Sequence, residues 1–422
     1  MGKRVSLIIL AIVLLMAFSA YAAEPVTIRY WGHSNPFFEE GNRQVIEAFE
    51  KENPHIKVVY ETFPYDTFLQ KTLTSFSVGE EPDIMEMSGR LILYYGKQGL
   101  ADPVPESIMT KSQIEDTFFP GAIGGYLFED NYYGLPKEYN FEYGGILANM
   151  EILEEVGVSS LPTTWDELVE VAQKATVRRG DLIARNGFYV GGHDATTYYF
   201  LAFLLQNGGQ FWNEDHTAVA FDTPEGKKAL QDLADLSLKH KIMRRESTSA
   251  VDMFAQKRAA MVAVGAWAIS YVRSEYPDLA LGYFATPSIS DSPPIFAAQS
   301  GWGFMVSKNS RNREAAWEFA KFAMQEEQAK TWLKATLNVP SMKQLSNDPE
   351  LLEVNPYLEV PFAMMPYGLP LGDLRNAQQF VRIISDHVDA VTLGGEDVDQ
   401  AVKAMETEIN QIIYETDHGL AN

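Results

Sequence analysis

The sequence predicts an α/β protein built from two domains. Segments with the composition of strands alternate along the chain with segments of helical spacing, which is the order of a largely parallel sheet with helical crossovers. The 422 residues exceed what one hydrophobic core usually serves. The composition, 46% hydrophobic and 22% charged, is that of a globular protein that can build two such cores.

The first 22 residues have the organisation of a secretory signal peptide. Lys3 and Arg4 precede an apolar run over residues 5–18, and the small-residue pattern Ala20-Tyr21-Ala22 follows it. A membrane anchor is the alternative, but the run is shorter than the ~20 residues that a spanning helix needs. We therefore expect cleavage near Ala22 and export of the mature chain.

The chain contains no cysteine. This excludes disulfides, a thiol nucleophile, a thiolate metal site and the cysteine that would carry a lipid anchor at the signal junction. A protein free in the periplasm is the expectation. The formal net charge of −23 disfavours nucleic acid and anionic lipid as partners, and it makes an anionic ligand less expected.

The N-terminal part begins with three predicted strands, "PVTIRYWGH", "IKVVYETF" and "DIMEM", separated by two predicted helices. The first helix, within residues 38–54, stops at a proline, and the second, within 66–82, stops at Gly79. Ligands of parallel sheets bind beyond the carboxyl ends of strands. Six residues at or near such ends are therefore candidate ligand contacts: Trp31, His33, Ser34, Met87, Ser88 and Arg90.

The rest of the chain continues the same pattern. Residues 142–150 and 301–308 read as strands, residues 161–175, 196–209 and 223–240 as helices, and the 161–175 helix has Thr164 as a cap with Glu167 three residues on. Residues 312–336 predict one long helix, 338–345 a joint marked by proline, and 376–415 two helices around Gly394-Gly395.

The segment "MVAVGAW" predicts a strand that ends at Trp267 and leads into a loop. Trp267 is large, and its indole N–H needs a partner when buried. Gly265 permits a close approach to the backbone. A ring that caps the core is the alternative interpretation of Trp267.

Several segments resemble the extracellular solute-binding proteins of ABC importers, in the sugar-binding family typified by maltose-binding protein. They are "YWGHSN…VIEAFEKENPHIKV", "SFSVGEEPDIMEM", "YYGKQGLADPVPE", "YYGLPKEYNFEYGGILANMEILEEVGVSSLPTTWDEL", "FAQKRAAMVAVGAW", "SGWGFMVSKNSRNREAAWEFAKFAMQEEQAKTWL" and "NVPSMKQL". The P-x-T-W-x-E-L helix start and the A-M-x-x-x-G-x-W strand, in this order behind a signal peptide, are together the most specific of these.

The resemblance implies a periplasmic-binding-protein-like α/β fold of two lobes with several hinge crossings and a ligand cleft between them. We expect one lobe from residues 23–137 plus 285–338 and the other from 138–284 plus 339–422. The pivots are expected near Pro136, at 283–287 and at 338–340. It also implies aromatic stacking on a sugar and delivery of the loaded protein, as a monomer, to the membrane subunits of an ABC permease.

Trp267 becomes the first candidate for the stacking ring, because the resemblance places it in the cleft. The other candidates lie at predicted strand ends, at the lobe crossing or in loops: Glu138, Tyr139, Tyr198, Trp302, Tyr367 and Arg375. A pyranose offers apolar faces to such rings and hydroxyls to such polar groups. Lys137, Glu138 and Tyr139 depart from the residues that many family members have there, so the substrate cannot be carried over through this loop.

Three alternatives remain at the level of sequence. A glycosidase needs two carboxylates at a set separation, but Glu138 with Glu142, or Asp83 with Glu86, shows only the features of a solvated edge, and common catalytic motifs are missing. Asp397 and Asp399 lack the pattern of a calcium loop. A polyol or glycerol phosphodiester and an oligopeptide remain possible ligands. We expect no enzyme activity, cofactor or metal, and a mono- or oligosaccharide as cargo.

Overall fold

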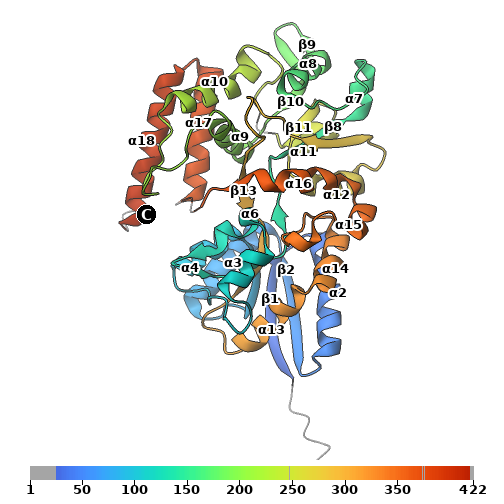
Figure 1. Cartoon of the computed structure of the whole chain (residues 1–422), viewed down its shortest axis with the longest axis vertical. Helices are drawn as coiled ribbons and strands as arrows, with labels where there is room; N and C mark the ends of the chain where they lie inside the picture. The colour runs from blue at the N-terminus through green and yellow to red at the C-terminus, as the bar shows by residue number, and fades with distance from the viewer. Residues whose placement is uncertain (1–24, 247, 373, 375, 419–422) are drawn as a thin grey trace, which may run out of the picture.

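The computed structural model describes residues 25–418 except 247, 373 and 375. Two five-stranded sheets lie in two lobes, one below the other in Figure 1, and a three-stranded sheet lies where the chain passes between them. Among these described residues, no helix is long and apolar enough to cross a membrane. The predicted α/β architecture is confirmed, with two mixed sheets rather than purely parallel ones.

Lobe 1, the lower lobe of Figure 1, is built on a sheet with the strand order β2-β1-β3-β14-β6. Its strands are β1 (Val26–His33), β2 (Ile56–Phe63), β3 (Ile84–Ser88), β6 (Leu135–Pro136) and β14 (Trp302–Val306). β1 runs parallel to β2 and β3, whereas β14 runs antiparallel to β3 and β6. The carboxyl ends of β1 and β3 therefore meet the start of β14 at one edge of the sheet.

Helices cover lobe 1. They are α2 (Pro36–Glu52), α3 (Tyr65–Val78), α4 (Gly89–Lys97), α5 (Lys111–Thr117), α6 (Pro120–Ile123), α13 (Arg313–Ala323) and α14 (Glu326–Thr336), with the short segments η1 (Gly124–Tyr126), β4 (Leu127–Phe128) and β5 (Asn131–Tyr132). The start of α2 is fixed locally, because the Asn35 side chain accepts from the amides of Phe37 and Phe38 and Pro36 opens the helix. The apolar stripe of α2 buries Val45, Ile46 and Phe49.

Lobe 2 is built on a sheet with the order β12-β8-β11-β10-β9. Its strands are β8 (Gly145–Asn149), β9 (Val177–Arg179), β10 (Leu182–Tyr189), β11 (Ala259–Ala263) and β12 (Leu281–Ala285), and its helices include α7 (Met150–Glu155), α8 (Trp165–Ala175), α9 (His193–Gln206), α10 (Pro224–Leu238), α11 (Ala250–Ala255) and α12 (Trp267–Glu275). The predicted capping box of α8 is confirmed, since the Thr164 side chain accepts from the Glu167 amide and the Glu167 carboxylate accepts from the Thr164 amide.

The C-terminal helices α17 (Ala377–Gly394) and α18 (Val398–Asp417) form a hairpin beside α9 and α10 (Figure 1). The hairpin turns at Gly395, whose φ of 72° lies in the left-handed region that glycine adopts without a steric cost. α18 buries Ala401, Met405 and Ile409. The predicted pair of helices around Gly394-Gly395 is confirmed.

Three passages of the chain connect the lobes. The central sheet has the order β15-β13-β7, from β7 (Tyr139–Asn140), β13 (Phe296–Ser300) and β15 (Gly368–Pro370). The third passage follows α14 and leads through η2 (Lys343–Leu345), α15 (Pro349–Val354), η3 (Pro356–Leu358), α16 (Glu359–Met364) and η4 (Met365–Tyr367). The exact lobe boundaries, residues 23–137 plus 285–338 and 138–284 plus 339–422, stay a prediction.

Three expectations differ from the structure. The helix predicted over 312–336 is two helices, because Gln325 is extended and the chain turns to pack α13 on β14 and α14 on α2. Trp267 opens α12 instead of ending a strand, since β11 stops at Ala263. Residues 283–285, the first part of a segment expected to pivot, pair with β8 inside the lobe 2 sheet, and the chain then runs through β13 of the central sheet to β14 of lobe 1.

Candidate functional site

An aromatic cluster lies where β1, α3 and β14 meet on lobe 1. We call His33, Tyr65 and Trp302 the lobe 1 cluster. The His33 imidazole stacks on the Trp302 indole with a centroid distance of 4.1 Å and an interplanar angle of 27°. Tyr65 lies edge-on to both rings, at 6.2 Å from each, and is 41% exposed. Phe38 packs edge-on against both His33 and Trp302. A half-exposed ring stack of this kind offers an apolar face with a polar rim.

His33 is held neutral by its surroundings. Burial lowers its pKa, the Lys137 ammonium lowers it further, and the Glu86 carboxylate opposes both. Its Nδ1 is buried and has no hydrogen-bond partner within the part of the chain that the structure describes. Because Nδ1 is covered, this unpaired nitrogen does not by itself offer a hydrogen bond to a ligand.

The start of α4 adds polar groups near the same sheet edge. Ser88, Gly89 and Arg90 follow β3, and Gly89 is required because a Cβ there would lie 2.5 Å from the Cβ of Ser300 and 2.9 Å from the Tyr126 ring. The Ser88 Oγ is buried without a hydrogen-bond partner among the described residues. Arg90 is exposed, as is Ser34 beyond the end of β1.

Two predicted contacts in lobe 1 belong to its core. Met87 is fully buried and faces Gly303 across the sheet. Trp31 is 3% exposed, its indole Nε1 donates to Glu61 Oε2 at 2.8 Å, and its ring packs edge-on against Phe63. Neither side chain offers a surface to a ligand in this structure. Trp31 lies on the same face of β1 as His33, two residues earlier, and is covered by Glu61 and Phe63. Met87 is packed inside the lobe.

A second cluster lies on lobe 2 and is centred on Trp267. We call Asn140, Glu142 and Trp267 the lobe 2 cluster. Trp267 is 43% exposed, and its Nε1 donates to Glu142 Oε1 at 2.6 Å. Asn140 Nδ2 donates to Glu142 Oε2 at 2.9 Å. The indole therefore keeps its partner at one edge while its body remains exposed, which favours the stacking role over the core cap.

Burial raises the pKa of Glu142, and the nearby Asp194 carboxylate raises it further, while the bonds from Trp267 and Asn140 oppose this. Asp194 is exposed in the first turn of α9. Tyr143 follows Glu142 and stacks on Tyr198 at 5.4 Å and 23°. Tyr198 is 3% exposed, so it backs the cluster and does not form its surface.

Gly265 explains how Trp267 is placed. A Cβ at this position would lie 2.7 Å from Cδ1 of Trp267 and 3.1 Å from the carbonyl oxygen of Phe141. The close approach predicted at this glycine is therefore the passage of the Trp267 ring over the turn between β11 and α12.

The two clusters lie on either side of one lobe crossing. The Trp302 amide donates to Glu138 Oε1 at 3.1 Å, and Asn140 and Glu142 follow Glu138 within four residues. Glu138 itself is buried, and so is Tyr139, whose ring packs on Gly121 and Gly368. The carboxylate oxygens of Glu138 are both bonded to protein. Neither side chain presents a free surface to a ligand, contrary to the expectation.

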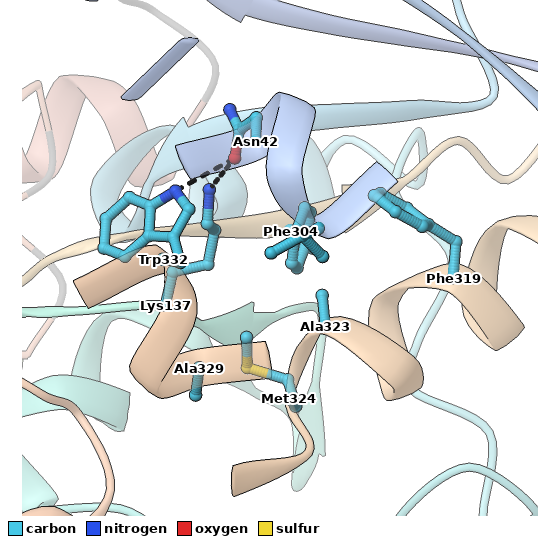
Figure 2. Close-up of a pocket in the computed structure, with 9 residues that line it drawn as sticks. Asn42, Lys137, Phe304, Phe319, Ala323, Met324, Ala329 and Trp332 are labelled. Atoms are coloured by element: carbon cyan, nitrogen blue, oxygen red, sulfur yellow. Dashed lines mark hydrogen bonds between the residues drawn. The ribbon is translucent and has the colours of Figure 1, made fainter. Parts of the chain in front are cut away.

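Lys137 lies on the far side of the crossing, in a buried network of lobe 1. Its Nζ contacts Glu86 Oε2 at 2.9 Å. Figure 2 shows Lys137 and Trp332 both donating to Asn42 Oδ1, beside a small cavity lined by apolar side chains. Burial acts to raise the pKa of Glu86, but Lys137 and the Tyr30 hydroxyl outweigh it and hold that pKa below its ordinary value. This network is core structure.

Two predicted ligand contacts, Tyr367 and Arg375, lie in neither cluster as the structure describes them. Tyr367 is 38% exposed at the end of η4, just before β15. Arg375 lies outside the described residues. Within those residues, no group of three or more His, Asp or Glu side chains could hold a metal ion.

Sequence reasoning missed Asn140, Glu142, Tyr65 and Asp194. Glu142 was considered only as half of a catalytic pair and set aside as a solvated edge. The signal that could have found it is its position, four residues after the predicted crossing and next to two aromatic residues in "NFEY".

Two lobes joined by three chain passages, with an exposed ring cluster on each side of the crossing, define a two-lobed solute-binding protein. The family model described as "Bacterial extracellular solute-binding protein" matches residues 39–330. The chain belongs to this family of non-enzymatic, maltose-binding-protein-like ABC transporter components, whose members act outside the cytoplasmic membrane.

Curated relatives and solved structures that are similar to this chain include further binding proteins. A binding protein of Brucella abortus is 27% identical over 327 residues, 75% of each chain, and the galactooligosaccharide-binding protein of Bacillus subtilis is 23% identical over 319 residues, 74% of this chain and 72% of its own. A Thermotoga lettingae solute-binding protein bound to α-D-tagatose superposes with a TM-score of 0.76 at 24% identity, over 92% of this chain and 100% of its own. The cyclic α-maltosyl-1,6-maltose binding protein of Arthrobacter globiformis gives 0.79 at 22%, over 92% and 99%.

Proposed function

We propose that the protein captures a mono- or oligosaccharide between its lobes in the periplasm and delivers it to the membrane subunits of an ABC permease. The observation that carries this proposal is Trp267, an exposed indole whose N–H is fixed by a carboxylate. An apolar plate beside a carboxylate acceptor matches the C–H face and hydroxyl rim of a pyranose.

The charges support a neutral cargo. Glu142 and Asp194 lie together on lobe 2, and the groups that influence Glu142 include no cation. A phosphodiester would meet like charge there and would depend on cations elsewhere, such as Arg90 on lobe 1. Hydroxyl groups, by contrast, donate well to carboxylates.

Binding by lobe closure follows from the position of the two clusters. Each cluster belongs to a different lobe, and only a closed state can bring both onto one ligand. The ligand then stabilises that state in proportion to the contacts that the open state lacks. The signal peptide and release into the periplasm are part of the same proposal, and the N-terminal mass of the exported protein tests them.

The function is tested by a thermal-shift screen of the mature protein. The panel contains glucose, xylose, maltose, trehalose, cello- and manno-oligosaccharides, inositol, glycerol phosphates and a short oligopeptide. A specific ligand at 100 times its Kd should stabilise the protein by about 2.7 kcal/mol. A shift with a neutral saccharide that is not consumed supports the proposal. Shifts confined to phosphates, polyols or the peptide would replace the sugar by that class.

A further inference from the structure

The three chain passages between the lobes meet at Glu138. The amide of Lys137 donates to the carbonyl of Trp302 at 2.9 Å, which joins the first passage to the second. The amide of Tyr139 donates to the carbonyl of Val339 at 2.8 Å, and Glu138 forms an isolated β-bridge with Pro340, which joins the first passage to the third. Glu138 therefore lies at the centre of the hinge region.

The Glu138 side chain also connects the first passage to the other two, through hydrogen bonds that its carboxyl oxygens accept. Oε1 accepts from the Trp302 amide at 3.1 Å, in the second passage, and Oε2 accepts from Asn338 Nδ2, in the third. The backbone of the second passage packs closely on Glu138. A Cβ at Gly301 would lie 2.5 Å from the carbonyl oxygen of Glu138 and 2.8 Å from the Cγ of Glu138. The side chain is 6% exposed.

We propose that Glu138 is a positioning residue for solute capture: its carboxyl group ties the three passages into one register and so sets how the lobes sit relative to each other before a ligand binds. The inference rests on the proposed function only in that capture requires the lobes to move. It assigns Glu138 no contact with the cargo, because the side chain is buried in the hinge region.

The charge of Glu138 is set by groups on several elements. Its pKa is raised to about 8, mainly by burial and with contributions from Glu86 on β3 and Glu142 after β7, whereas the Trp302 amide and Lys137 act to lower it. The Tyr126 hydroxyl is the other titratable group that senses this carboxylate. Lys137 is itself engaged with Glu86 and Asn42, and among the described residues Glu138 has no ion pair. Ionisation would strengthen both accepted bonds, because charge-assisted bonds are shorter and stronger. The hinge should therefore respond to pH near neutrality.

The test measures the distance between the lobes in the ligand-free protein. Because the chain has no cysteine, Lys51→Cys on α2 and Gln231→Cys on α10, both at exposed positions, give one spin-label pair across the lobes. Double electron–electron resonance is recorded after unfolding and refolding to remove any bound solute. The pair is introduced into the wild type, Glu138→Ala, Glu138→Gln and a control, Thr197→Ala. Thr197 is also fully buried and donates to Val381, but within lobe 2.

We expect one narrow distribution of the distance between the spin labels for the wild type and for Thr197→Ala. In Glu138→Ala this distribution should become broad. Between pH 6 and pH 9.5 the wild-type distribution should shift. Glu138→Gln, which keeps a neutral group and can retain both bonds if the Asn338 amide flips, should not shift, whereas Glu142→Gln should still do so. Should Glu138→Ala not fold, Asn338→Ala removes one of the two bonds and serves in its place.

A folded Glu138→Ala or Asn338→Ala variant with the wild-type distribution would overturn the positioning role. A pH response that is retained in Glu138→Gln or missing from the wild type would also overturn it. No sugar is used, so either failure leaves the proposed cargo standing. A failed sugar screen would likewise leave this measurement intact.

Discussion

At the scale of single residues, Glu142 links structure to function most directly. One of its oxygens fixes the edge of Trp267 and the other accepts from Asn140, and burial already raises its pKa. A partly exposed carboxylate with lone pairs to spare is a strong acceptor for ligand hydroxyls.

Glu142→Gln should weaken saccharide binding about tenfold, because hydrogen bonds to a charged acceptor exceed neutral ones by roughly 1.4 kcal/mol. Isothermal titration calorimetry measures this, with Glu170→Gln on the exposed surface of α8 as the matched control. Equal affinities for Glu142→Gln and the wild type would rule out a direct role for the carboxylate.

His33 predicts a dependence of stability on pH. Its pKa is lowered by burial in the folded state, so below about pH 6.5 the unfolded chain binds a proton that the folded chain does not. The free energy of unfolding of the wild type should fall relative to that of His33→Gln as pH drops from 7.5 to 5.5. Urea unfolding at both pH values measures the difference. A constant difference would mean that the imidazole is not held neutral.

At the scale of elements, the turn between β11 and α12 positions the stacking ring. Gly265→Ala places a methyl group within contact of the Trp267 ring and the Phe141 carbonyl, so the ring must move. We expect at least a tenfold loss of saccharide affinity with a small change in Tm. Gly157→Ala, at an open left-handed position on lobe 2, is the control for backbone strain. Unchanged affinity in Gly265→Ala would show that the ring's position is not critical.

The hairpin of α17 and α18 contributes to the lobe 2 core. Ile409 is fully buried in the interface of α18. Ile409→Ala should lower the free energy of unfolding by about 2–4 kcal/mol, measured by chemical denaturation, and should leave saccharide affinity unchanged. Leu393→Ala, 68% exposed on α17, should change stability by less than about 0.5 kcal/mol. Similar small effects at both positions would mean that the hairpin is loosely attached.

Element prediction succeeded where local signals were strong and failed where packing decides. The α8 capping box and the glycine stops at 79 and 395 are local chemistry, and each was readable in the sequence. The break between α13 and α14 has no proline or glycine to mark it. It follows from tertiary packing: α13 packs on β14 and β1 as well as on α2, whereas α14 packs mainly along α2, and no local pattern encodes this difference.

At the scale of the whole molecule, the two-lobed fold was predicted through a resemblance spread over the chain, whereas the site depended on three-dimensional placement. Three of the ligand contacts predicted from the sequence lie in the two clusters: Trp267, Trp302 and His33. Trp31 and Met87 were named by the same strand-end rule, yet their side chains point into packed core. The rule locates the sheet edge, but it does not determine which side chains there are covered by neighbouring elements.

The central claim is that one saccharide contacts the rings of both lobes. Its most direct test is calorimetric titration of the saccharide found in the screen into the wild type, Trp267→Ala, Trp302→Ala and Tyr414→Ala, the last an exposed aromatic residue on α18. The account predicts that each tryptophan variant loses about tenfold or more in affinity, and that Tyr414→Ala binds as the wild type does. Full affinity in either folded tryptophan variant would contradict capture between the two clusters.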